Sequence, residues 1–224
     1  MFKNLLSFWK GKDFLTQVFS EFNQMLDDTK CMYEMVCKTL LDNIEEPGLK
    51  KKIHEMDKNV NRLQKSIRTR IIEHLSLQPT VDVAACLLLM SVVKDAERLG
   101  DYAKNLFEVT EFLAKPIDRA LFSQYFNEVD KDVLVLFEQT KEAFIETDLN
   151  VATSTWNYEK KIAKGCDEIV AKVAQSNLTV NEAVCFALIA RHFKRIVAHL
   201  VNIATSVILP LSDLDYFDER RAFE

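Results

Sequence analysis

Glycine and proline are scarce in this sequence, with four of each among 224 residues. Both residues break helices and populate tight turns, so a sheet-rich fold with many turns would need more of them. Apolar residues instead recur at helical spacing along most of the chain. The sequence therefore predicts an all-α fold. At 48% hydrophobic residues, the chain is long enough for one large core or two small ones.

Charge excess, long apolar runs and paired cysteine motifs are missing too. The net charge of -5 is spread over 29 basic and 34 acidic residues, without the clearly basic face of a nucleic-acid binder. No stretch approaches the roughly 18 apolar residues that cross a bilayer. The cysteines are odd in number, lack Cys-x-x-Cys spacing and follow no secretory signal, so we expect buried free thiols in the cytoplasm. They are Cys31, Cys37, Cys86, Cys166 and Cys185.

Prolines, together with an acidic turn at Asp148 and a polar break at Ser176-Asn177, divide the chain into six long helical segments. The predicted helices cover residues 13–44, 49–77, 81–113, 117–146, 151–175 and 179–209. Thr179 and Glu182 have the spacing of a capping box, which marks the start of the last helix. Helices of about 25–33 residues joined by short turns pack antiparallel as bundles.

The third and sixth predicted helices carry the same residue pattern. Arg98-Leu99 and Asn105-Leu106 are matched 97 positions later by Arg195-Ile196 and Asn202-Ile203. This offset indicates a duplicated three-helix unit. We therefore expect two tandem antiparallel three-helix bundles. The expected division is a segment over residues 1–12, repeat one over 13–114, repeat two over 117–209 and a tail over 210–224.

Oxygen-bearing side chains follow one face of the third predicted helix. Glu97, Asp101 and Asn105 are four residues apart, which places neighbours about 5–6 Å from each other. Asp57 and Asn61 repeat the spacing in the second helix, and Asp57 is as far from the intervening turn as Asp101 is. The two groups should therefore face each other, and such oxygens suit a hard cation. The simpler explanation of the third helix alone is a solvated acidic face.

Two alternatives use the same residues differently. Facing carboxylates also occur in di-iron bundles, but these use Glu-x-x-His, and none of the four histidines has Glu three residues before it. The sequence offers no nucleophile–base pair and no phosphate-binding glycine loop either. A metal-dependent enzyme using the same carboxylates is thus disfavoured. A helical scaffold without metal is the other alternative.

Three motifs in this sequence resemble the PhoU family: Asp57-Lys-Asn-Val-Asn61, Gln78-Pro79 leading to Asp82, and Glu97-Arg-Leu-Gly-Asp101. The resemblance spans nearly the whole chain as two three-helix repeats. It implies a negative regulator of phosphate uptake, not an enzyme, that contacts a membrane phosphate transporter and a sensor kinase. It also implies metal ions (Mg, Mn, Fe or Zn) held on the bundle surface by acid-x-x-x-Asp motifs. Here the implied ligands are Asp57, Asn61, Glu97, Asp101 and Asn105.

The second repeat departs from this pattern. Its matching stretches are Glu159-Lys-Lys-Ile-Ala163 and Lys194-Arg-Ile-Val-Ala198, in which only Glu159 stands at an expected acidic position. Alanine cannot coordinate a metal, and an ammonium group repels one. We expect Lys194 to pair with Glu159 in place of a second metal site. The nearby His199 follows the family pattern but is expected to be a packed or surface residue, not a ligand.

Two further regions are candidates for contacts with other molecules. Residues 1–12 have apolar side chains at Phe2, Leu5, Leu6 and Trp9, together with three lysines and no acid. This pattern fits a helix packed on the bundle, which we favour, or a peripheral helix on the inner face of a membrane. Aromatic residues could cover a homodimer contact. They are Phe122, Tyr125, Phe126, Tyr216 and Phe217.

Overall fold

The computed structural model describes residues 13–44 and 46–214, and this part of the chain is all-helical. Its seven α-helices and one 3-10 helix are α2 (Asp13–Asp42), α3 (Leu49–Leu77), α4 (Val83–Phe112), α5 (Arg119–Phe126), α6 (Val129–Glu146), α7 (Leu149–Ala174), α8 (Val180–Thr205) and η1 (Leu211–Asp213). The predicted all-α class is confirmed. The expected segment over residues 1–12 lies outside the described residues.

Local signals place several helix ends where the sequence predicted them. The bounds of α3 agree with the prediction, between the turns that contain Pro47 and Pro79. The capping box at the start of α8 forms, because the Thr179 hydroxyl accepts from the Glu182 backbone N–H while the Glu182 carboxylate accepts from Thr179 N at 3.1 Å. Helix α2 ends before Ile44 because Asn43 turns the chain with a φ of 55°.

The prediction of one continuous helix over residues 117–146 is wrong, because two helices, α5 and α6, cover this stretch. Asn127 separates them with a φ of 50°, a conformation that asparagine tolerates better than most residues. The Asp118 carboxylate caps α5 by accepting hydrogen bonds from two backbone N–H groups of its first turn. The described part of the chain therefore contains seven α-helices where six were expected.

The short helix α5 changes the role of its aromatic residues. Phe122 and Phe126 are fully buried and stack with ring centroids 4.2 Å apart. Both rings pack edge-on against Phe186 of α8. The hypothesis that they cover a dimer contact is therefore wrong, since they belong to the core. Tyr125 is half-buried against the same phenylalanine, and the pair at 216–217 lies outside the described residues.

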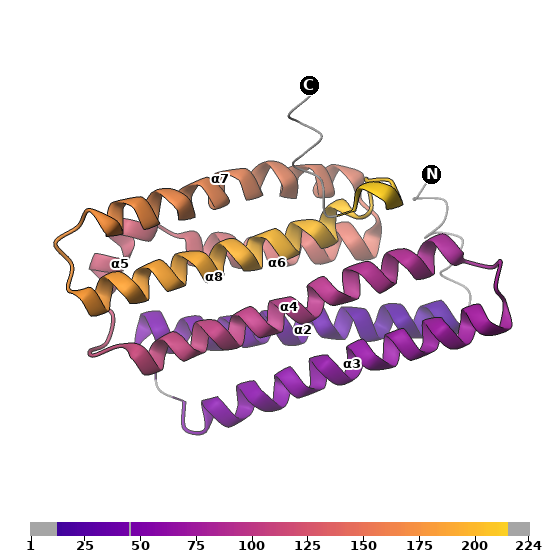
Figure 1. The fold of residues 1–224 in the computed structure, drawn as a ribbon, viewed down its shortest axis with the longest axis horizontal. Helices are drawn as coiled ribbons and strands as arrows, with labels where there is room; N and C mark the ends of the chain where they lie inside the picture. Colours follow the sequence, from indigo (N-terminus) through magenta and orange to yellow (C-terminus); the bar gives the residue numbers. More distant parts are fainter. Residues whose placement is uncertain (1–12, 45, 215–224) are drawn as a thin grey trace.

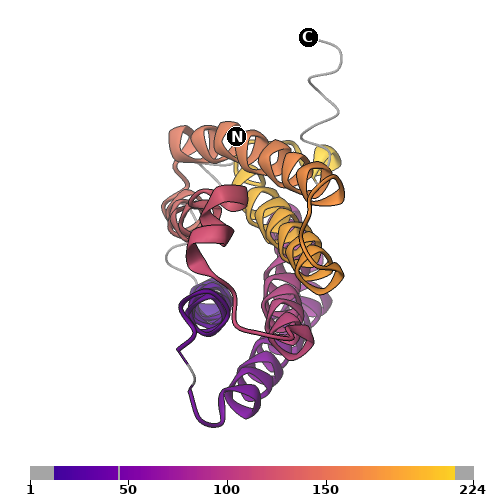
Figure 2. The same cartoon turned by 90° about the vertical axis from the view of Figure 1, so that its left-hand side faces the viewer.

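The helices form two three-helix units that are fused side by side (Figure 1). Helices α2, α3 and α4 pack together, and α6, α7 and α8 form the second unit. Helix α4 lies along α8, and α2 lies beside α6, so two helices of each unit build the joint (Figure 2). The two expected bundles are thus one elongated body with α3 and α7 on its outer sides.

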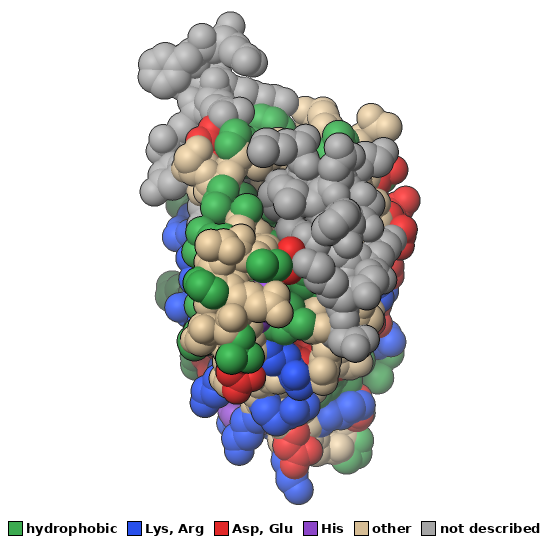
Figure 3. Space-filling model, turned by 90° about the vertical axis from the view of Figure 1, so that its right-hand side faces the viewer, with side chains coloured by type: hydrophobic (Ala, Val, Ile, Leu, Met, Phe, Trp, Pro, Cys, Tyr) green, Lys and Arg blue, Asp and Glu red, His purple; other side chains and the backbone are tan. Residues whose placement is uncertain are grey.

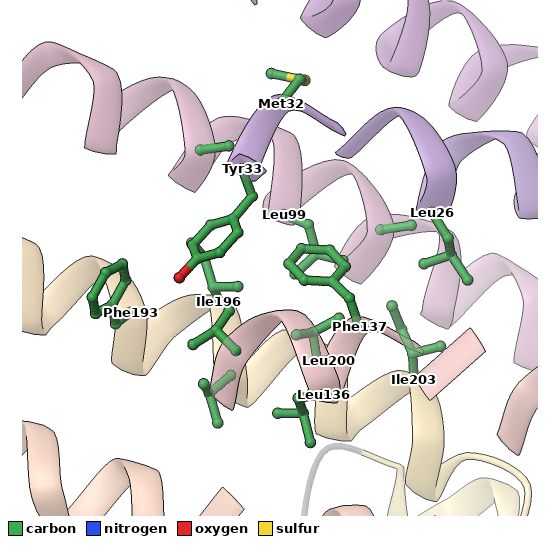
Figure 4. Packing of buried hydrophobic residues seen from close by; sticks show 14 of the residues in the cluster. Leu26, Met32, Tyr33, Leu99, Leu136, Phe137, Phe193, Ile196, Leu200 and Ile203 are labelled. Atoms are coloured by element: carbon green, nitrogen blue, oxygen red, sulfur yellow. The ribbon is translucent and has the colours of Figure 1, made fainter. Parts of the chain in front are cut away.

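A single hydrophobic core runs through both units. Side chains of four helices meet in it, including Tyr33 of α2, Leu99 of α4, Phe137 of α6 and Ile196 of α8 (Figure 4). Leu99 and Ile196 are both fully buried and are related by the 97-residue offset. Burying a side chain of this size stabilises the fold by about 1.5–3 kcal/mol. The two repeats therefore have equivalent apolar residues at matching buried positions.

Four of the five cysteines are buried and all five are free, as predicted, but Cys31 is exposed on α2. Burial raises the pKa of the Cys37 thiol to about 12 and that of Cys166 to about 12. These two thiols therefore stay protonated and behave as small apolar side chains. Among residues 13–44 and 46–214, none of the helices has an apolar stretch that could span a lipid bilayer.

Exposed hydrophobic side chains mark both ends of the body. Figure 3 shows the end where α3 meets α4, with hydrophobic side chains beside a group of lysines and arginines. The first turns of α4 and α8 expose Val83 and Leu87 in one repeat, and Val180 and Val184 at the offset of 97 in the other. Since α4 and α8 start at opposite ends, each end carries one equivalent apolar patch (Figure 1).

Candidate functional site

Helices α3 and α4 bring the acidic residues of the first repeat together. The carboxylate of Asp57 lies beside the α4 backbone at Gly100, where an added Cβ would be 3.8 Å from its Oδ1. That distance is an ordinary van der Waals contact, so a small residue is accommodated here but glycine is not required. The antiparallel packing places Asp57 at the level of Asp101, as the equal distances from the turn predicted.

A lysine of α4 occupies the space between these two carboxylates. The ammonium of Lys104 lies 3.1 Å from Asp57 Oδ2 and 3.1 Å from Asp101 Oδ1. The guanidinium of Arg98 lies 3.0 Å from Asp101 and 3.8 Å from Glu97. Burial opposes the charge of Lys104, yet the hydrogen bonds that it donates to the two aspartates raise its pKa overall. Three carboxylates therefore share two cations.

Glu97 is the least neutralised of the three acids. Burial raises the pKa of Glu97, and the negative charge of Asp101 raises it further, while Arg98 acts in the opposite direction. A raised pKa means that the ionised carboxylate lacks full compensation in the fold. This is the electrostatic condition in which an added cation would be stabilising.

The two predicted amide ligands lie on the same helices but at different levels. Because α3 and α4 are antiparallel, Asn61 lies at the level of Glu97, one turn from Asp57, while Asn105 lies beyond Asp101 in the other direction. Both are half-buried, and neither makes a side-chain hydrogen bond within residues 13–44 and 46–214. The structure therefore gathers the three acids more closely than the two amides.

The side chains as they stand do not form a cation cage. No three His, Cys, Asp or Glu side chains of the described ranges converge where a metal ion could be held. The donor chemistry nevertheless fits a hard cation, since carboxylate and amide oxygens are its preferred ligands. What stands in the way is the Lys104 ammonium, which makes contacts that a metal ion would have to replace.

The second repeat pairs Lys194 differently from the prediction. Lys194 of α8 forms an ion pair with Asp167 of α7, whereas the sequence predicted a pair with Glu159. Asp167 is eight residues beyond Glu159, or about 12 Å along the helix. The reason is directional, because side chains on a helix point toward its N-terminus. Lys194 thus reaches toward the start of α8, where the last half of the antiparallel α7 lies.

A buried polar cluster, which the sequence did not predict, lies between the repeats. Asp95 of α4 is 1% exposed, and its Oδ1 lies 2.7 Å from His199 Nδ1 and 3.2 Å from Asn202 Nδ2 of α8. Its second oxygen is buried with no partner in the described part of the chain. His199 is therefore a packed residue that fastens one repeat to the other.

An aromatic pair marks the symmetry axis between the repeats. The ring of Tyr102 stacks on that of His199 with centroids 5.5 Å apart, and it also touches His192 at 6.1 Å. Tyr102 and His199 are 97 positions apart, so the duplication exchanges them. A residue and its own counterpart can touch only close to a pseudo-twofold axis. The sequence does relate these two positions, because Tyr102 and His199 are separated by the 97-residue offset of the duplication.

The fold and these contacts define an all-helical protein made of two fused three-helix repeats, with its polar chemistry on the third helix of each. The model of the PhoU domain matches residues 22–110 and 126–207, which covers both units. The chain therefore belongs to the PhoU family of phosphate-transport accessory and regulatory proteins, which are not enzymes.

Curated relatives and solved structures agree with this assignment. The chain is 23% identical over 202 residues to the phosphate-specific transport system accessory protein PhoU homolog 1 of Thermotoga maritima, covering 84% of this chain and 86% of that one. It is 26% identical over 180 residues to the PhoU homolog of Synechocystis, covering 78% and 79%.

The fold is shared with crystal structures of PhoU proteins. For PhoU from Pseudomonas aeruginosa the TM-score is 0.76 at 20% identity, over 87% of this chain and 95% of the other. For the phosphate transport system regulatory protein PhoU from Streptococcus pneumoniae it is 0.71 at 17% identity, over 88% and 95%. At this identity the comparison shows the fold alone. The predictions of family, fold and a non-enzymatic role are confirmed.

Proposed function

We propose that this chain is a negative regulator of phosphate uptake that acts by binding other proteins. Its principal partner is a membrane phosphate transporter, and a sensor kinase is the second. The match of the PhoU model to both repeats carries this proposal. The relatives' names, which describe accessory proteins of a phosphate-specific transport system, support the choice of partner.

The exposed apolar patches support a role in protein contacts. Val180 is 81% exposed and Val184 52%, and exposed hydrophobic clusters of this kind often mark interaction sites. A protein that meets the transporter from the cytoplasm needs no membrane span of its own. We place the chain in the cytoplasm, peripheral to the inner face of the membrane when bound, and expect a homodimer.

Phosphate uptake by cells that lack this chain tests the proposal. In phosphate-rich medium, deletion of the gene should raise the initial rate of uptake, and the wild-type chain supplied in trans should lower it again. A variant with Val180→Asp and Val184→Asp should restore control less well than one with the solvent-facing substitution Lys160→Gln. An uptake rate that is unchanged by the deletion would contradict the proposal.

We also propose a metal site in the first repeat, with Asp57, Asn61, Glu97, Asp101 and Asn105 as ligands and Mg, Mn, Fe or Zn as the ion. Three half-buried carboxylates on facing helices support it, together with the raised pKa of Glu97. A bound ion would neutralise the acids and hold α3 to α4. The test is the metal content of the purified wild type against Glu97→Ala with Asp101→Ala. Equal content in both would favour a metal-free scaffold.

A further inference from the structure

Lys104 is positioned by both the helix and the helix pair. It follows Asp101 by three residues, and its side chain points back along α4 over that carboxylate. The same ammonium reaches Asp57 on α3, so one group bridges two helices. The side chain of Lys104 is 22% exposed and that of Asp57 only 14%, which shields the contact from much of the solvent.

An ammonium group and a metal ion cannot occupy this position together. The two aspartate oxygens each lie 3.1 Å from the Lys104 nitrogen, whereas a hard cation binds oxygens at about 2.0–2.6 Å. Both occupants are positive, and their repulsion is strong at short range in a partly buried site. Metal binding therefore requires Lys104 to swing out and both carboxylates to close in.

The second repeat also contains a lysine that links its second and third helices. Its third helix also supplies a lysine, Lys194, which pairs with an acid of the preceding helix. The lysines are not at equivalent positions, because Val201 stands 97 residues after Lys104. Each repeat thus ties its second and third helices together with a cation of its own chain.

We propose that Lys104 is a built-in cation that occupies the acidic site of the first repeat and that a metal ion binds there only by displacing it. This inference rests on the metal site proposed above and adds its regulation. Lys104 keeps α3 and α4 paired in the absence of metal and lowers the affinity of the site for metal. Occupancy then depends on the free metal concentration, and the site need not be permanently loaded.

Calorimetric titration of the full-length, metal-stripped protein with Mn²⁺ tests this competition. Lys104→Met removes the ammonium and keeps the apolar stem, whereas Lys94→Met removes an exposed lysine of the same helix and serves as the control. We expect Lys104→Met to bind Mn²⁺ at least about tenfold more tightly than wild type, and Lys94→Met to bind like wild type. Mn²⁺ should also raise the melting temperature of Lys104→Met more than that of the wild type.

The possible outcomes separate the two proposals. If wild type and Lys104→Met bind Mn²⁺ with the same affinity, Lys104 does not compete, and this inference is overturned while the metal site stands. If neither binds and Lys104→Met melts cooperatively, the metal site is absent and both proposals fail. Should Lys104→Met not fold, Lys104→Gln provides the same comparison with a polar side chain.

Discussion

The two repeats of this chain share an interior and differ at the surface between their second and third helices. Leu99 and Ile196 fill equivalent buried positions. In contrast, Asp101 of the first repeat corresponds to Ala198 in the second repeat, 97 residues later. Buried apolar positions tolerate little change in volume, whereas exposed polar positions can change at a cost of about 0.5 kcal/mol or less. The duplication is therefore preserved where packing constrains it, and the repeats diverge where solvent can compensate.

The largest expected effect tests the shared interior. Leu99→Ala and Ile196→Ala should each lower the free energy of unfolding by about 2–5 kcal/mol, because each leaves a cavity in the same core. Chemical denaturation followed by circular dichroism measures both. A loss near zero for one of them would mean that the repeats do not share a core.

The next effect concerns the joint between the repeats. Asp95→Ala should cost about 1–3 kcal/mol, because His199 and Asn202 then lose their buried acceptor. The matched control is His192→Ala, at the offset position in the second repeat, which should cost less than Asp95→Ala. A double-mutant cycle of Asp95→Ala with His199→Ala measures the coupling directly. Additive losses would show that the contact does not contribute to the joint.

A smaller difference should separate the two lysines. In metal-free buffer, Lys104→Met should cost about 1 kcal/mol, since Lys104 bridges two shielded carboxylates. Lys194→Met should cost less than about 0.5 kcal/mol, because its partner Asp167 is 56% exposed. Thermal unfolding of both variants side by side provides the comparison. The reverse order would show that the second repeat carries the stronger helix tie.

The smallest effect lies at the starts of α4 and α8. The hydrogen bond from Thr179, with help from Lys115, lowers the pKa of Glu182 to about 2. A lowered folded-state pKa means that this contribution is complete above the usual value of 4.5 and is lost as the pH falls toward about 2. In Glu182→Gln, the melting temperature should therefore fall less steeply than in the wild type as the pH is lowered from 4.5 to about 2. Melting temperatures of the wild type and Glu182→Gln measured at several pH values provide the test, and parallel curves would contradict it. The N-cap residue of α4, Asp82, makes no side-chain cap hydrogen bond, so the two helix starts differ in this respect.

The fold was largely predictable because its signals are local. Prolines and a capping box fix the ends of α3 and the start of α8, and helical periodicity identifies the apolar faces. The break at Asn127 was missed because a single asparagine is a weak turn signal beside the helical periodicity of the residues on both sides. Likewise, the exposure of Cys31 depends on which face of α2 meets the core.

The approach of Asp57 to Asp101 was predictable from the sequence, but the contacts of these carboxylates were not. The spacing of Asp57 and Asp101 from the turn correctly brought them together. The structure shows that Lys104 lies between these two carboxylates and that Lys194 pairs with Asp167. Both contacts depend on the direction in which side chains of two neighbouring helices point. Sequence spacing describes one helix at a time, so it gives no account of which lysine reaches which acid.

The contact between Tyr102 and His199 also means that a half-turn about an axis close to it exchanges α4 with α8. For these two helices, the backbone alone would not tell a docking molecule which end of the body it meets. The charges distinguish the two ends. Helix α4 carries Glu97 and Asp101, whereas α8 carries Lys194 and the uncharged Ala198 at the matching positions. The polar side chains of α4 and α8 therefore distinguish the two ends, and substitutions at these positions would change that difference.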